Sequence, residues 1–283
     1  MIQVGIRLHD VNTTVGKELQ TLEERAKTAH ERGFKCVHLA LSKNGYPNDP
    51  CALSEGLGFH VKRVFEENKL DIAVLGCYLN LLHPDPIERR RIKEKYYANL
   101  RLARIMGAGM VGTETGCPNA EYRYTLQNLS QETLDDFIRS LEDVVVSAEA
   151  IGSTIAIEPV TKHCVFDASR ALEVIRTLRS PNLRIIFDPV NLLSIDNYEK
   201  RDYVLADAMD KLHDYIAMVH IKDFTVENGD LKACAAGEGL MNYDEILKFL
   251  KAKKPWVQAT LENTSDNNSV RSRELIERIY SEV

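Results

Sequence analysis

Short apolar runs alternate with amphipathic stretches along the whole chain. The apolar runs are brief and bounded by polar residues, as buried β-strands are. In the stretches between them, apolar residues recur every three or four positions, as on one face of an α-helix. The predicted strands are residues 2–7, 36–41, 71–79, 109–114, 154–159, 184–189, 216–221 and 257–262. The predicted helices are residues 18–32, 55–68, 86–106, 131–151, 168–179, 199–213, 242–253 and 270–281.

Eight strands alternating with eight helices predict parallel βα units. In a chain of 283 residues this count favours an α/β fold of one domain, a (β/α)8 TIM barrel over residues 1–283. A doubly wound open sheet is the alternative. The turn after the first strand lacks the GxGxxG pattern of an open sheet that binds a dinucleotide. A loop insertion around residues 224–240 lengthens the seventh unit.

Local signals mark several helix ends. Gly33, Gly107 and Gly152 follow predicted helices, where a left-handed residue commonly ends the helix. Ser130 precedes a helical run and is predicted to cap it.

Four predicted strands end in a polar residue that can bind a metal: Glu158, Asp188, His220 and Glu262. The steps between them are 30, 32 and 42 residues, each one βα unit, the last lengthened by the insertion. Strand C-termini meet at one rim of a barrel, so the four side chains are expected to converge. Any one of them alone reads equally as a helix cap or an ion pair. Together they form an oxygen-rich set with one imidazole, which suits Mn²⁺, Mg²⁺, Co²⁺ or Zn²⁺.

Composition narrows the class of protein. The net charge of −6 disfavours a nucleic-acid-binding surface. No apolar run reaches the length of a membrane span, and the N-terminal residues do not resemble a signal peptide. Six scattered cysteines without a CxxC pair indicate reduced thiols rather than a zinc site. We therefore expect a cytoplasmic protein with neither a nucleic acid nor a membrane as partner.

The strand-end motifs resemble those of the xylose isomerase-like barrel superfamily, and more closely its sugar and sugar-phosphate isomerase/epimerase branch. The motifs are Glu158-Pro, Phe-Asp188-Pro-x-Asn191, His220-x-Lys222-Asp223 and Leu-Glu262-Asn. The resemblance implies a metal held by Glu158, Asp188, His220 and Glu262, with Mn²⁺ as the first expectation. It also implies a small carbohydrate substrate, a ketose or ketose phosphate.

The resemblance further implies catalytic roles for Glu158 and Glu262. The metal stabilises an enediolate, one glutamate removes a proton from the carbon beside the carbonyl, and the other returns it. This sequence of steps gives epimerisation. A single carboxylate acting in both steps gives aldose–ketose isomerisation.

Six further residues are expected to bind substrate or to support the ligands: His83, Glu114, Asn191, Lys222, Asp223 and Glu238. Four of them also have a structural interpretation. His83 suits a surface loop, Glu114 and Asp223 suit helix caps, and Glu238 suits an ordinary turn between two glycines.

Three positions depart from the free-ketose 3-epimerases of the family. Asn191 stands where those enzymes commonly have His, Cys164 (beside His163) where they have a substrate-binding Glu, and Val226 where they have Arg. The Asp-x-x-Asn form is closer to pentulose-phosphate 3-epimerases. Arg271 and Arg273 at the start of the last helix are possible phosphate ligands, and a solvated helix start is the other interpretation.

Three other functions remain open at this stage. A metal-dependent dehydratase of the inosose or dehydroshikimate type shares the barrel and much of the ligand set. An abasic-site endonuclease needs further ligands and a basic groove. A barrel that binds metal without catalysis is the non-enzymatic reading. Assembly into a homodimer or homotetramer is also expected.

Overall fold

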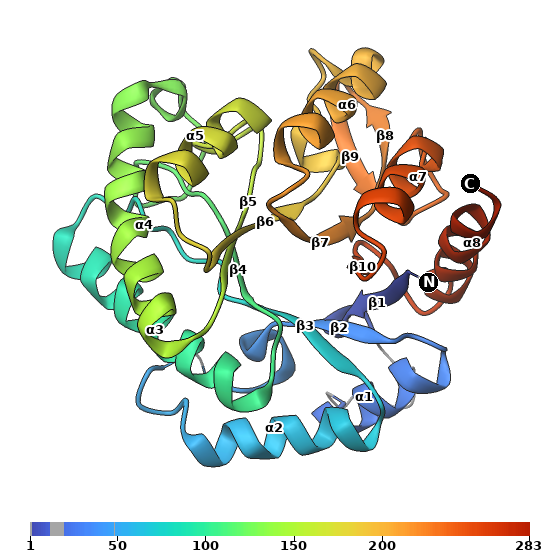
Figure 1. Ribbon diagram of the computed structural model, residues 1–283, viewed down its shortest axis with the longest axis horizontal. Coiled ribbons are helices and arrows are strands. Elements are labelled where there is room, and N and C mark those ends of the chain that lie inside the picture. The colour runs from blue at the N-terminus through green and yellow to red at the C-terminus, as the bar shows by residue number, and fades with distance from the viewer. Residues whose placement is uncertain (1, 12–19, 48) are drawn as a thin grey trace.

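The computed structural model describes residues 2–11, 20–47 and 49–283. Eight parallel strands form a closed barrel in the order β1-β10-β7-β6-β5-β4-β3-β2, and the helices surround it (Figure 1). The barrel strands are β1 (Gln3–Arg7), β2 (Cys36–Leu39), β3 (Asp71–Gly76), β4 (Val111–Glu114), β5 (Ile155–Glu158), β6 (Leu183–Phe187), β7 (Ile216–Ile221) and β10 (Gln258–Leu261). The helices are α1 (Leu22–Glu31), α2 (Glu55–Glu67), α3 (Pro86–Met106), α4 (Gln131–Ile151), α5 (Ala168–Leu178), α6 (Arg201–Leu212), α7 (Asp244–Lys253) and α8 (Ser269–Glu282).

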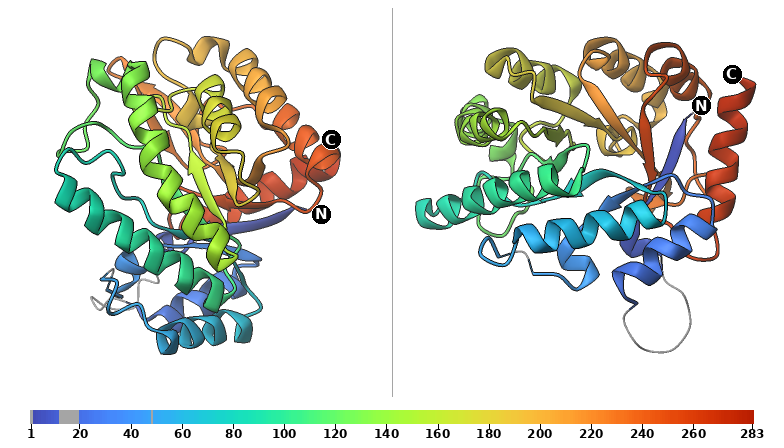
Figure 2. Two further views of the ribbon diagram at one scale, coloured as in Figure 1. Left: turned by 60° about the vertical axis from the view of Figure 1, so that its left-hand side comes forward. Right: turned by 60° about the horizontal axis from the view of Figure 1, so that its bottom comes forward.

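The first strand closes the barrel. On one side β1 pairs with β10, from Gln3 opposite Gln258 to Ile6 opposite Leu261. On its other side β1 pairs with β2. The open-sheet alternative is therefore excluded, and the TIM barrel prediction is confirmed. Helix α8 packs beside β1, which brings the two ends of the described chain to one side of the molecule (Figure 2).

Most element boundaries agree with the prediction to within two residues. The predicted helices 86–106 and 131–151 have those bounds in the structure. Helix α1 begins at Leu22, because Thr21 and Glu24 form a reciprocal capping box there; residues 18 and 19 lie outside the described part. Several strands are shorter than predicted, so Asp188 and Glu262 each lie one residue beyond a strand.

The predicted caps are present. Ser130 accepts a hydrogen bond from the backbone N–H of Thr133 at 3.1 Å and starts α4. Gly107 and Gly152 end α3 and α4 with left-handed backbones (φ 76° and 70°). Gly33 follows α1 with φ 85°. Each glycine takes up a conformation in which a side chain is strained.

The insertion predicted around residues 224–240 is present, and it contains a β-hairpin that was not predicted from the sequence. Strand β8 (Asp223–Glu227) pairs antiparallel with β9 (Asp230–Cys234). Asn228 and Gly229 between them have φ values of 53° and 78°. An Asn-Gly pair with two positive φ angles is the favoured two-residue hairpin turn.

Apolar side chains fill the barrel below its mouth. Cys36, Val74, Ala156, Ile186 and Met218, from five strands, belong to one buried cluster. Successive side chains of a strand point to opposite sides, so the residue two positions further along faces the same side. That residue is His38 in β2, Glu158 in β5 and His220 in β7. The layer of polar side chains at the mouth therefore lies directly above a layer of buried apolar side chains in the barrel interior.

Two general findings concern the whole described chain. No helix within it is long and apolar enough to cross a membrane. All six cysteines are free thiols.

Candidate metal centre

The four predicted metal ligands converge at the mouth of the barrel. The Nδ1 atom of His220 lies 3.2 Å from Glu158 Oε2, 3.6 Å from Glu262 Oε1 and 4.0 Å from Asp188 Oδ2. All four residues are buried. Two atoms that each bind one ion at about 2.1 Å lie roughly 3–4 Å apart. These separations therefore suit ligands of a single cation.

The imidazole of His220 supports this interpretation independently. The ring is fully buried, and neither nitrogen has a hydrogen-bond partner within the described residues. Buried polar groups are almost always hydrogen-bonded or bound to metal. A ring nitrogen that faces three carboxylates is suited to bind a divalent cation.

Neighbouring side chains and backbone N–H groups hold two of the carboxylates in place. Asn191 donates from Nδ2 to Glu158 Oε1 at 2.6 Å, and the Tyr78 hydroxyl donates to Glu158 Oε2 at 3.4 Å. The backbone N–H groups of Val190 and Asn191 donate to Asp188 Oδ1 at 3.0 and 3.1 Å. Such partners fix the orientation of metal ligands.

Lys222 brings a positive charge to the same cluster. Its Nζ lies 2.6 Å from Asp188 Oδ2 and 3.3 Å from Glu262 Oε2. Three ionised carboxylates and one ammonium group leave two negative charges, and one divalent cation neutralises them. The net charge of these four groups and the types of their ligand atoms therefore both suit a divalent cation.

His38 and Arg7 complete the side of the site near β1 and β2. His38 stacks on His220 with ring centroids 5.2 Å apart, and its Nδ1 lies 3.6 Å from Glu262 Oε1. Arg7 Nη1 lies 3.8 Å from Glu262 Oε2. His38, His220 and Glu262 form a second group with metal-ligand spacing. None of His38, Arg7 and Tyr78 was among the predicted site residues.

The pKa values reflect crowded, buried charges. Burial, with the nearby Glu262 adding to it, raises the pKa of Glu158 to about 7. Burial also raises the pKa of Asp188 to about 6, against the opposing effect of Lys222. Burial would likewise raise the pKa of Glu262, but His220, Lys222 and Arg7 hold it well below its usual range. Since metal ligands must be deprotonated, metal affinity is expected to fall in acid.

Glu114 also lies at this mouth. It ends β4, directly opposite Glu158 in the strand register. The Tyr122 hydroxyl donates to Glu114 Oε2 at 3.3 Å, and His163 Nε2 lies 3.8 Å from the same oxygen. Burial, and after it the charge of Glu158, raises the pKa of Glu114 to about 7. Tyr122 and His163 were not among the predicted site residues.

Three predicted substrate residues have other contacts in the structure. The His83 ring accepts from the backbone N–H of Asp85 at 3.2 Å, at the start of α3. Asp223 accepts from the backbone N–H groups of Phe224, Gly237 and Met241 at 2.8, 3.1 and 2.8 Å, and so anchors the loop after β9. Glu238 accepts from Arg271 at 2.7 Å. These contacts support loops and a helix start, and none of them involves the four predicted metal ligands.

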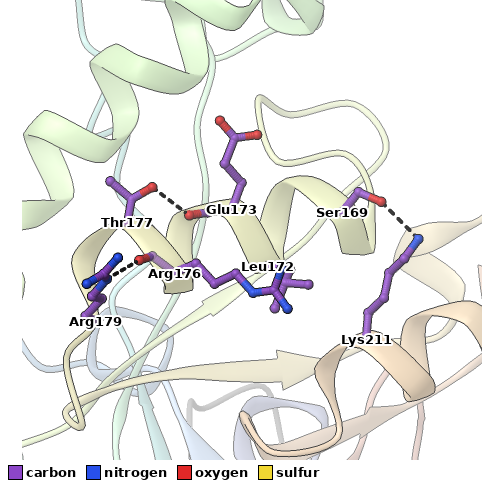
Figure 3. A pocket seen from close by; sticks show the side chains of 7 residues that line it. All are labelled: Ser169, Leu172, Glu173, Arg176, Thr177, Arg179 and Lys211. Atoms are coloured by element: carbon purple, nitrogen blue, oxygen red, sulfur yellow. Dashed lines mark hydrogen bonds between the residues drawn. The ribbon is translucent and has the colours of Figure 1, made fainter.

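Cavities also lie outside the barrel centre. One, of about 760 Å³, lies between α5 and α6, where Lys211 donates to Ser169 and where Arg176 and Arg179 also line the cavity (Figure 3). It contains no predicted site residue. A second, of about 750 Å³, is lined by Asn191, Thr161, Phe166, Ile195 and others. Through Asn191 this second cavity adjoins the metal centre.

The chain belongs to the xylose isomerase-like TIM barrel family. The sequence profile of that family matches residues 26–281. No curated protein sequence matches the chain.

Solved structures with the same fold include a sugar epimerase, a probable dehydratase and a protein with a bound zinc atom. One is the 3-keto-D-glucoside 4-epimerase YcjR from E. coli, with 17% identity, a TM-score of 0.72, and coverage of 98% of this chain and 100% of that one. Another is AsbF, a probable 3-DHS dehydratase from Bacillus anthracis, with 16% identity, a TM-score of 0.72 and coverage of 98% of both chains. A third is the IOLI protein with a bound zinc atom, with 16% identity, a TM-score of 0.74, and coverage of 100% and 99%. Because the sequence identities are this low, the structural similarity establishes the shared fold alone.

Proposed function

We propose that the protein is a divalent-metal-dependent isomerase or epimerase of a ketose or ketose phosphate. The observation that carries the proposal is the convergence of Glu158, Asp188 and Glu262 on the buried His220 at the barrel mouth, whose ring has no hydrogen-bond partner among the described residues. Active sites of TIM barrels lie at this end.

Glu158, Asp188, His220 and Glu262 would hold the cation, for which Mn²⁺ is our first choice and Mg²⁺, Co²⁺ and Zn²⁺ are alternatives. When bound, the cation supplies Lewis acidity that stabilises the negative charge of an enediolate. The oxygen-rich ligand set is consistent with a hard or borderline metal.

Glu158 and Glu262 are proposed to move the protons. They come from β5 and from the end of β10, on either side of β6 and β7, so they flank the other two ligands. One carboxylate removes the proton from the carbon beside the carbonyl, and the other returns it to the opposite face. Asn191 and Tyr78 orient Glu158, and Lys222 and Arg7 orient Glu262.

A dehydratase is the second candidate, because AsbF has the same fold. It would begin with the same proton removal and then expel a hydroxyl group. The mass of the product separates the two reactions, since only a dehydratase releases water.

Deuterium exchange tests the proposal. The metal-loaded protein is incubated in D₂O with ketoses, ketose phosphates and inososes, and products are read by NMR and mass spectrometry. We expect deuterium beside the carbonyl without loss of water, and a loss of at least about 100-fold in Glu158→Gln and Glu262→Gln. Glu245→Gln, on α7, is the control that keeps activity.

Other outcomes are equally informative. Exchange that persists in both glutamine variants contradicts the assigned roles. Loss of water identifies a dehydratase. Tight metal binding without exchange in any compound favours a binding role. Cytoplasmic location and assembly into a dimer or tetramer stay predictions, and light scattering checks the assembly.

A further inference from the structure

Glu114, Tyr122 and His163 form a polar cluster beside the metal centre that the proposed proton transfers do not use. The Tyr122 hydroxyl holds Glu114 Oε2 at 3.3 Å, and the Tyr122 and His163 rings pack with centroids 5.1 Å apart. Tyr122 has a left-handed backbone (φ 54°), which is uncommon for a residue other than glycine. Such conformations persist where the surroundings enforce them, often at binding sites.

The loop after β5 turns His163 toward Glu114. Its neighbour Cys164 is fully buried, and the Cys164 thiol contacts the Thr115 carbonyl at 3.3 Å. Cys164 occupies the position where the resemblance implied a substrate-binding residue, and its side chain is buried in the loop instead. His163 is only 8% exposed, and its Nδ1 has no hydrogen-bond partner within the described residues.

The spacing of His163 and Glu114 suits a hydroxyl group that hydrogen-bonds to both. His163 Nε2 and Glu114 Oε2 are 3.8 Å apart, too far for a direct hydrogen bond. An oxygen atom about 2.8 Å from both atoms bridges them at normal hydrogen-bond lengths. The carboxylate needs a donor and an imidazole N–H needs an acceptor, and a hydroxyl provides both. A fully ionised phosphate oxygen can only accept.

The charges around this cluster also disfavour a phosphate. Burial lowers the pKa of His163 to about 4, so the ring is neutral at pH 7. Lys222 is paired with Asp188 and Glu262. Lys162, next to His163, lies 3.4 Å from Asp230.

At the usual phosphate position of a TIM barrel, both nearby arginines are paired with protein groups. That position is formed by the loops after the last strands and a helix N-terminus. Here Arg271, near the start of α8, is paired with Glu238 at 2.7 Å. Arg273 is paired with Glu277 and donates to the Arg32 carbonyl. Both arginines that the sequence suggested as phosphate ligands thus have protein partners.

We propose that Glu114, Tyr122 and His163 form a hydroxyl-binding subsite, an inference that rests on the proposed function. The subsite selects an uncharged polyhydroxylated substrate, a free ketose or related polyol ketone, over the corresponding phosphate ester.

The test measures binding separately from catalysis. Alditols lack the carbonyl and cannot react, so pairs such as ribitol and ribitol 5-phosphate report recognition alone. Isothermal titration on the Mn²⁺-loaded protein should show the free alditols binding at least about 10-fold more tightly than their phosphates. Removing one ligand hydroxyl at a time should identify a deoxy analogue whose affinity falls about 10-fold.

Variants assign that hydroxyl to the cluster. His163→Phe keeps a ring beside Tyr122 but removes the N–H, so the difference in affinity between the parent alditol and its deoxy analogue should shrink in this variant, with only the hydrogen bond to Glu114 left. Tyr122→Phe should weaken alditol binding, and Tyr124→Phe, in the same loop, is the matched control. Metal affinity should be unchanged in all three. A variant that does not fold leaves the deoxy series on the unaltered protein as the deciding measurement.

The outcomes separate this inference from the proposed function. Phosphates that bind as tightly as the free alditols, full discrimination by His163→Phe, or no alditol binding at all would each overturn the subsite. Deuterium exchange into phosphate esters in preference to free ketoses would overturn it and leave the proposed reaction intact. Alditol binding that depends on His163, without exchange into any ketose, would support the subsite and contradict the reaction.

Discussion

His220 shows how single residues define the site. Its buried Nδ1 faces three carboxylates, and neither ring nitrogen has a hydrogen-bond partner in the part of the chain that the structure describes. Asn191 and Tyr78 hold Glu158, and Lys222 lies between Asp188 and Glu262. Leaving so many charges buried is unfavourable unless they are compensated. A divalent cation provides that compensation and also explains the unbonded imidazole.

Removing a ligand or its support should weaken metal binding in a graded way. Asn191→Ala removes the hydrogen bond to Glu158 Oε1, and a loss of about 10-fold in Mn²⁺ affinity is expected. His220→Ala removes a ligand, so its loss should exceed 100-fold. Titration calorimetry measures both. His83→Ala is the control, and equal effects of all three changes would contradict the proposed centre.

The buried His163 predicts a pH dependence of stability in the metal-free protein. Its folded pKa is about 4, below the usual 6.5, so the unfolded state binds more protons between these values. The contribution to the free energy of unfolding is complete above pH 6.5 and is lost as the pH falls toward 4. Its size is up to about 3 kcal/mol. Urea unfolding of the original protein and of His163→Asn, compared from pH 4 to 7, should show a shallower slope for the variant.

At the scale of elements, Asp223 joins the β8–β9 hairpin and the following loop to the end of β7. Its carboxylate accepts three backbone hydrogen bonds. The packing here is tight, since a Cβ atom on Gly239 would lie 2.2 Å from the Phe224 carbonyl oxygen. The loop that carries Glu238 is therefore held rigidly against the barrel.

Asp223→Ala should release this loop. The backbone N–H groups of Gly237 and Met241 lose their acceptor, and a destabilisation of about 3 kcal/mol is expected. Hydrogen exchange at these two amides should accelerate, while amides in β5 and β6 stay protected. Asp230→Ala, at the exposed hairpin turn, should change neither property. Unchanged exchange at Gly237 and Met241 would contradict the anchoring role.

At the scale of the whole molecule, the barrel and its helices bury four of the six thiols. Cys36, Cys77, Cys117 and Cys164 are buried, Cys234 is half-buried and Cys51 is exposed. Burial raises the pKa of Cys77 and of Cys164 to about 12, which removes the reactive thiolate at neutral pH.

Thiol labelling should therefore follow burial. With iodoacetamide at pH 8, Cys51 should react first, Cys234 slowly, and the four buried thiols only after unfolding. Peptide mass spectrometry identifies the labelled residues. Cys51→Ser should abolish the fast reaction, whereas rapid labelling of Cys36 in the folded protein would be inconsistent with the closed barrel.

Much of the fold was predictable because its signals are local. Helix α4 is defined by Ser130, a three-to-four-residue apolar repeat and Gly152, all close together in sequence. The β8–β9 hairpin was missed although Asn228-Gly229 marks it. His38 and Tyr78 were also predictable in principle, since they lie two and four residues beyond the lumen residues Cys36 and Val74.

The sequence by itself determined the order of elements, the helix caps and the strand-end positions of Glu158, Asp188, His220 and Glu262. These depend on hydrophobic period and on hydrogen bonds between residues a few positions apart. Only the tertiary structure decided which side chains meet: His38 on His220, Lys222 between Asp188 and Glu262, His163 facing Glu114, and Arg271 bound by Glu238. Such contacts depend on barrel closure and on loop paths, which bring together residues that no local pattern relates.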